Sequence, residues 1–258
     1  MNSIERDRED FEFLQITARA GRERGLDHFG HLDQPIGIWN YIRIANDIAE
    51  HVPCGRLLDW GCGLGQMTYL LRRRGFDVVP YEMLGTAEAL PELPLTREVQ
   101  IVVGRHPTRL PFDTGHFDAV LSCGVLEHVD EYSEPGNEVL ALREIHRVLR
   151  PGGYFPIYQL PQLYTWQEAI TRTFGIGYAH PRRFVEREIR AMLSHTGFAV
   201  ERVRRFNMLP KNLTGVPNVL RSLYSTMSGA VLAADRVLSS VPLLNRVAGV
   251  LEVLARRQ

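Results

Sequence analysis

The sequence predicts an α/β fold with a doubly wound, mostly parallel sheet, and three observations support that prediction. Short apolar runs alternate with amphipathic helical segments through residues 56–159, a pattern typical of parallel strands joined by right-handed crossovers. A glycine-rich turn joins the first apolar run to the first of these helices. The chain has 258 residues, 45% hydrophobic and 23% charged, enough for one such folded domain with additions.

The glycine-rich turn is the strongest functional signal. The apolar pair Leu57 and Leu58 ends at Asp59, and glycines follow at alternate positions: Gly61, Gly63 and Gly65. Glycine tolerates positive φ and leaves room for a ligand at the backbone, while the helix that begins at Gln66 offers unpaired N–H groups. A dinucleotide fingerprint would need a third glycine where Gln66 stands. An acidic Asp59 would repel a pyrophosphate but suits a cationic amino acid group.

A second carboxylate lies at the end of the next expected strand, residues 76–82. Glu82 is about twenty residues beyond the glycine turn, where α/β nucleotide sites place a carboxylate that binds the ribose hydroxyls. A surface glutamate at a strand end is the alternative. We further expect strands at 100–104, 117–122, 154–158 and 199–206, and helices at 66–74, 138–149 and 184–195.

Three segments resemble class I methyltransferases that depend on S-adenosylmethionine (SAM), in particular the methyltransferase type 11 group: 58–65, 110–129 and 147–153. The resemblance implies a Rossmann-like sheet and SAM as cofactor. It also implies that Cys123 borders the methionine part of SAM and that His128 lies near the same crevice. Arg105 stands where the family often has an acidic residue for adenine, so backbone groups, an apolar sandwich or an arginine cation–π contact remain open for that role. The cofactor-binding residues expected are Asp59, Gly61, Cys62, Gly63, Gly65, Glu82, Met83, Arg109, Leu110 and Cys123.

The acceptor site is expected around an insertion at about 160–182. Its aromatic residues Tyr164, Trp166 and Tyr178 are expected substrate contacts, although plain packing explains them equally well. Trp39, from the amino-terminal helices, is a further expected contact, although an aromatic residue at helical spacing is more often part of the core. His180 is the preferred general base and His128 the second candidate. A lone histidine is more often structural than catalytic.

Composition argues against several partners. Thirty basic and thirty acidic residues give no formal net charge, so nothing favours capture of nucleic acid. Three scattered cysteines make neither a disulfide framework nor a zinc site, and no acidic cluster follows the fourth or fifth strand to bind magnesium. We expect a small-molecule or lipid-like acceptor and no metal.

The two ends are expected to be helical: a cap at 1–50, before the methyltransferase core at 51–206, and an extension at 207–258. The extension carries a helical apolar stripe that Pro242 divides into two helices, and no seventh strand is evident. The stripe can pack on its own sheet, form a homodimer or contact a membrane surface peripherally. Without a signal sequence or a spanning segment, we expect a cytoplasmic protein.

The function expected is therefore methyl transfer from SAM to a small molecule. Two alternatives remain. One is a methyltransferase-like binding protein without activity, and the other is an NAD-dependent oxidoreductase, which Asp59 and Gln66 disfavour.

Overall fold

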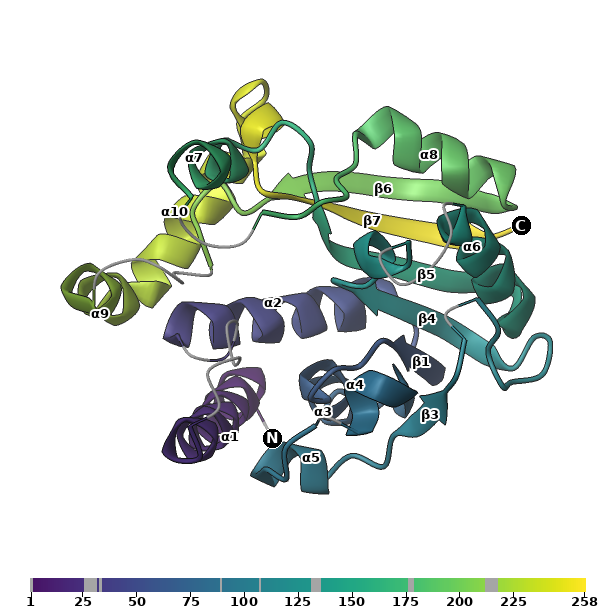
Figure 1. The fold of residues 1–258 in the computed structure, drawn as a ribbon, viewed down its shortest axis with the longest axis horizontal. Helices are drawn as coiled ribbons and strands as arrows, with labels where there is room; N and C mark the ends of the chain where they lie inside the picture. Colours follow the sequence, from purple (N-terminus) through teal and green to yellow (C-terminus); the bar gives the residue numbers. More distant parts are fainter. Residues whose placement is uncertain are drawn as a thin grey trace.

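One seven-stranded sheet organises the molecule (Figure 1). The computed structural model describes residues 2–25, 32, 34–88, 90–106, 108–130, 136–175, 179–211 and 218–258. Its strands lie in the order β3-β2-β1-β4-β5-β7-β6. Their bounds are β1 Arg56–Trp60, β2 Asp77–Met83, β3 Val102–Gly104, β4 Phe117–Cys123, β5 Leu149–Pro161, β6 Phe198–Phe206 and β7 Val250–Arg257.

The first five strands are parallel where they pair, and β7 runs antiparallel between β5 and β6. The carboxyl ends of β1, β2 and β4 therefore meet at one edge of the sheet, where ligands bind in open α/β sheets. This arrangement confirms the predicted α/β fold with a doubly wound, mostly parallel sheet.

Helices cover both faces of the sheet (Figure 1). Those of the first half of the chain are α1 Ser3–Glu23, α2 Pro35–His51, α3 Gln66–Arg72, α4 Leu84–Glu88 and α5 Pro94–Arg97. The second half contributes α6 Asn137–Val148, α7 Trp166–Phe174, α8 Glu186–His195, α9 Asn218–Thr226 and α10 Ser228–Ser240, with short 3₁₀ helices at Leu126–His128 and Leu244–Val247.

Two apolar clusters make the core, one on each face of the sheet. The first joins α1, α2 and α3 to the sheet through Leu14, Ile44, Leu70 and Leu121 among others. The second joins α6 and α8 to the opposite face through residues such as Leu142 and Leu193. Because the side chains of β4 alternate between the two clusters, the central strands are buried on both faces.

The chain end differs from the sequence prediction. Helices α9 and α10 are present, but Met227 separates them, and the residues after Pro242 form a 3₁₀ helix and then β7. The expectation of helix to the end of the chain, with no seventh strand, was therefore wrong. Leu251, Val253 and Ala255 are buried in the sheet, so this part of the apolar stripe packs on the protein itself.

None of the helices in the described ranges combines the length and apolar character that crossing a membrane requires. The division into a cap, a core and an extension stays a prediction, although α1 and α2 share one apolar cluster with the sheet.

Candidate functional site

Backbone hydrogen bonds shape the glycine turn at the carboxyl end of β1. The N–H groups of Gly61 and Cys62 both donate to the carbonyl oxygen of Tyr81, at 2.9 and 3.0 Å. The N–H of Gly63 donates to Glu82 Oε2 at 2.8 Å, and that of Met83 donates to Glu82 Oε1 at 2.7 Å. Glu82, only 7% exposed, is thus hydrogen-bonded to the turn from the neighbouring strand.

The three glycines of the turn have different roles. All three have positive φ, which an L side chain adopts with strain. A Cβ on Gly61 would lie 2.7 Å from Val125, and one on Gly65 would lie 2.8 Å from Val99, so both positions are packed. A Cβ on Gly63 would meet nothing within 4 Å. The turn therefore leaves an open face beside Gly63, next to Glu82.

Asp59 lies beneath this turn and is 2% exposed. Its Oδ2 accepts a hydrogen bond of 2.6 Å from the hydroxyl of Thr68. Burial, with a smaller contribution from the nearby charge of Glu82, raises the pKa of Asp59 to about 6, against the lowering effects of Thr68 and Arg72. A buried carboxylate without a strong cationic partner is suited to a ligand that carries positive charge.

Tyr41 of α2 reaches the same edge of the sheet. It is buried near Cys123 and the side chains of Gln66 and Gln159, and burial raises its pKa far above the ordinary value. Gln66 Oε1 is buried without a hydrogen-bond partner among the described residues. Gln159, near the end of β5, has a φ of 59°, a conformation that non-glycine residues adopt at a cost.

These glutamines were not predicted as site residues. The identity of Gln66 argues against a dinucleotide fingerprint but indicates no role in the site, and no property of the sequence distinguishes Gln159 from an ordinary strand residue. Cys62 and Cys123 lie close by, and burial raises the pKa of both thiols, so each is protonated at neutral pH.

The two histidines expected to act in catalysis lie side by side. The ring centroids of His128 and His180 are 6.3 Å apart. Glu168 of α7 is nearly buried, and its Oε1 lies 2.5 Å from His180 Nδ1. Arg183 lies 3.4 Å from the other oxygen of Glu168. A carboxylate in this position makes Nδ1 the protonated nitrogen and leaves Nε2 as the acceptor.

Other predicted site residues lie in varied places. Arg109 is exposed, and the N–H of the buried Leu110 donates to Glu144. Trp166 donates its indole N–H to the carbonyl oxygen of Met208, and Tyr164 is 67% exposed. Tyr178 lies outside the described residues.

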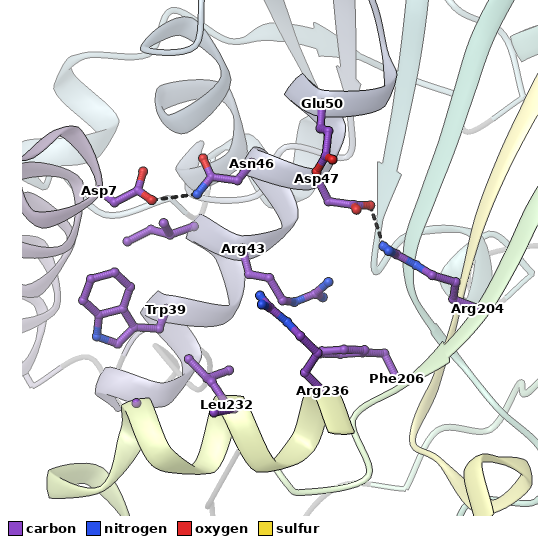
Figure 2. A pocket seen from close by; sticks show the side chains of 13 residues that line it. Asp7, Trp39, Arg43, Asn46, Asp47, Glu50, Arg204, Phe206, Leu232 and Arg236 are labelled. Carbon is purple, nitrogen blue, oxygen red and sulfur yellow. Dashed lines mark hydrogen bonds and ion pairs between the residues drawn. The ribbon is translucent and has the colours of Figure 1, made fainter. Parts of the chain in front are cut away.

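Trp39 stacks on Phe11 with ring centroids 4.9 Å apart and lines a pocket between α2 and α10 (Figure 2). It lies two positions from Tyr41, and two residues turn a helix by about 200°. Trp39 therefore faces away from the side of α2 that contacts the glycine-turn region.

The residues present fit SAM. Asp59 offers a buried carboxylate, the chemistry that suits a cationic amino group, Glu82 retains acceptor capacity for hydroxyl groups beyond its two backbone bonds, and a Cβ on Gly63 would meet nothing within 4 Å. The sheet with its antiparallel seventh strand, together with this carboxylate-led turn, resembles that of the class I methyltransferases.

Comparison with known proteins supports this class. Residues 58–157 match the family model described as a methyltransferase domain. The probable tRNA methyltransferase 9B of Homo sapiens is 32% identical over 116 residues, which cover 45% of this chain and 24% of that protein. The matched segment spans only 22% to 24% of the first curated relatives.

Two solved structures share the fold. A possible histamine N-methyltransferase from Thermotoga maritima has a TM-score of 0.56 at 17% identity, covering 95% of this chain and 99% of that one. The 1,6-didemethyltoxoflavin-N1-methyltransferase of Burkholderia thailandensis, solved with S-adenosylhomocysteine, has a TM-score of 0.52 at 20% identity, covering 96% and 88%. Residues 58–157 thus resemble a methyltransferase domain, and the chain shares its fold with solved methyltransferases, one of which was solved with S-adenosylhomocysteine.

Proposed function

We propose that the chain transfers a methyl group from SAM to a small-molecule acceptor, a natural product or a lipid-like metabolite. The observation that carries the proposal is the joint arrangement of Asp59, Gly63 and Glu82: a buried carboxylate with a raised pKa, an open glycine face and a second carboxylate hydrogen-bonded to the same turn. Each matches one part of a sulfonium nucleoside.

The proposed mechanism rests mainly on positioning. SAM, when bound, supplies an activated methyl group on a sulfonium. Asp59 binds the amino group, Glu82 binds the ribose hydroxyls, and Cys62 and Cys123, as neutral thiols, line the site without adding charge. Orientation of this kind contributes about 7–11 kcal/mol, whereas a general base adds about 10²–10⁴ in rate.

His180 is the proposed base where the acceptor atom carries a proton. Glu168 lies 2.5 Å from its Nδ1 and orients the ring, and Nε2 is the nitrogen proposed to accept the proton. His128 lies beside it and provides a second imidazole for the same proton.

The acceptor class follows from charge. With thirty basic and thirty acidic residues, the chain has no basic surplus of the kind that binds nucleic acid. The similarity to a probable tRNA methyltransferase covers less than half of this chain, so a small molecule remains the proposed acceptor.

A test of the cofactor site uses calorimetric titration with S-adenosylhomocysteine. Wild type should bind it, and Glu82→Ala should weaken binding by about tenfold or more, because hydrogen bonds to charged groups contribute about 1.5–3 kcal/mol. Glu88→Ala, an exposed glutamate six residues on, is the matched control and should bind as wild type does. Equal binding by Glu82→Ala would remove the basis of the proposal.

A methyltransferase-like binding protein is the second candidate, since the acceptor is not identified. Tight binding of S-adenosylhomocysteine together with no methyl transfer from SAM to any fraction of cellular small metabolites or lipids would favour it. A rise in the thermal unfolding temperature with NADH but not with S-adenosylhomocysteine would instead favour an oxidoreductase.

A further inference from the structure

A pocket of about 590 Å³ lies between α2, β6 and α10 (Figure 2). Its volume is in the range of pockets that hold small organic molecules. Part of its lining is apolar and aromatic, with contributions from all three elements: Trp39, Ile42, Phe206 and Leu232.

This pocket is distinct from the candidate cofactor site. From α2 it is lined by Trp39, Arg43 and Asn46, which follow the 3–4 residue spacing of one helix face. Tyr41, on the opposite face, contacts Gln66 and Gln159 at the glycine-turn region. The body of α2 therefore lies between the two sites.

Three arginines and three carboxylates line the pocket, and the ion pairs on its α2 and β6 side extend to Arg202 and Glu252 behind the lining. Arg43 Nη2 lies 2.5 Å from Glu252, while Arg204 lies 3.0 Å from Glu252 and 2.5 Å from Asp47. Arg202 lies 2.8 Å from Asp47. Burial acts to raise the pKa of Asp47, but the Tyr158 hydroxyl and these arginines outweigh it and hold the pKa below its usual value. Three guanidinium groups, those of Arg43, Arg202 and Arg204, thus share two carboxylates, Asp47 and Glu252.

A fourth guanidinium enters the pocket from the other side. Arg236 of α10 lines it, is exposed, and has no ion-pair partner within the part of the chain that the structure describes. Asp7, also in the lining, is already paired with Arg74 at 2.9 Å. Glu50 is an exposed lining carboxylate, and in Figure 2 it lies at the opposite end of the lining from Arg236. At the end of the pocket formed by Arg43 and Arg236, Arg43 is paired with Glu252, so the charge of Arg236 is the one that no carboxylate of the described residues pairs.

A cation is a poorer fit at the other end. Asp47, Glu50 and His51 bring their ligand atoms within 4.8 Å of one another, as a metal site would require. Arg202, however, lies 2.8 Å from Asp47 Oδ2 and 2.7 Å from His51 Nε2, so a guanidinium already occupies that position.

We infer that this pocket binds a small amphipathic carboxylate, with the acid group at Arg43 and Arg236 and the apolar body against Trp39, Phe206 and Leu232. Guanidinium groups bind carboxylates through paired, charge-assisted hydrogen bonds, and the aromatic walls favour a hydrocarbon body. The inference does not depend on methyl transfer, because it concerns the other face of α2.

The test titrates three probes with one hydrocarbon body: 4-phenylbutyrate, 4-phenylbutanol and 4-phenylbutylamine. Calorimetry should show binding of the carboxylate, weaker binding of the alcohol and none of the amine. Arg236→Gln should weaken the binding of 4-phenylbutyrate by about tenfold, because it removes one charge-assisted pair. Arg246→Gln removes another exposed arginine, outside the pocket lining, and should leave binding unchanged.

A second variant blocks the pocket without harming the fold. Gly229 lines it from α10, and a Cβ there would meet nothing within 4 Å. Gly229→Leu should abolish binding of 4-phenylbutyrate, and leucine favours a helix over glycine. Its S-adenosylhomocysteine binding should match that of wild type, which reports an intact fold and a separate site. No 4-phenylbutyrate binding by wild type at millimolar concentration, equal binding of the alcohol, or full binding by Gly229→Leu would each overturn the inference.

Discussion

Asp59 and Glu82 lie at the carboxyl ends of adjacent strands, yet their surroundings differ. Glu82 accepts two backbone N–H bonds and so holds the turn in place. Asp59 has one hydroxyl partner, Thr68, and burial raises its pKa to about 6. Glu82 thus has two backbone partners without a ligand, whereas burial outweighs the partners that stabilise the charge of Asp59, so a bound cation would stabilise that charge further.

This difference predicts a pH dependence of cofactor binding. Below pH 6 Asp59 is protonated in the free protein, and a bound cationic amino group lowers its pKa. The affinity for S-adenosylhomocysteine should therefore fall by up to about tenfold per pH unit as the pH drops below 6. Calorimetric titration at a series of pH values from 5 to 8 measures this change in affinity.

The control for this prediction is Asp59→Asn, which cannot titrate. This variant should bind S-adenosylhomocysteine more weakly than wild type at pH 8, and its affinity should not fall further as the pH drops below 6. An unchanged pH profile in this variant would mean that another group titrates there.

The position of Glu168 predicts which ring nitrogen of His180 carries the proton. Because the carboxylate lies 2.5 Å from Nδ1, the neutral ring should carry its proton on Nδ1, and ¹⁵N NMR of the imidazole distinguishes the two tautomers. Glu168→Ala should remove this preference, while the exposed His195 should give the same spectrum in both proteins. The same His180 tautomer in the variant would show that Glu168 does not position the ring.

Local motifs made part of the site predictable. Asp59, the three glycines and Glu82 follow from spacing along single strand–turn units, so the sequence alone places them together. The position of Gln159 does not follow from sequence spacing, because its backbone conformation depends on how β5 ends. Trp39 and Tyr41 are equally aromatic, and only the packing of α2 decides that Tyr41 contacts the glycine-turn region while Trp39 lines the other pocket.

At the level of elements, β7 shows where sequence periodicity is uninformative. Leu251 and Val253 pack on one face of the sheet and Leu254 on the other, so the strand is apolar on both sides. A run of this kind has neither the alternation of a half-exposed strand nor a unique helical stripe. Its one acidic side chain, Glu252, is buried and ion-paired with Arg43 and Arg204 from α2 and β6.

The burial of β7 predicts a large stability cost there. Leu251→Ala should lower the free energy of unfolding by about 2–5 kcal/mol, because it opens a cavity at a fully buried position. Leu243→Ala, at a 68% exposed leucine just before the strand, should change it by less than about 0.5 kcal/mol. Urea denaturation measures both, and equal effects would mean that the strand is not part of the core.

Across the whole molecule, α2 links the two ligand sites that we propose. It packs with α1 and α3 in one apolar cluster, contributes Tyr41 toward the glycine turn, and presents Arg43 to the pocket beside α10. Methyltransferase sequence motifs cover 58–157, so the second pocket, built mostly from residues outside them, could not be predicted from the resemblance.

Cofactor binding should stabilise the folded chain as a whole. A ligand that binds only the folded state at 100 times its Kd adds about 2.7 kcal/mol, and at this chain length each kcal/mol raises Tm by about 2–4 °C. S-adenosylhomocysteine at that ratio should therefore raise Tm by about 5–11 °C in a calorimetric scan, whereas NADH should give no shift. Asp59→Asn should lose most of the shift at the same ligand concentration. A shift with NADH alone would assign the glycine turn to a dinucleotide, because the measurement separates the two cofactors on one protein under one set of conditions.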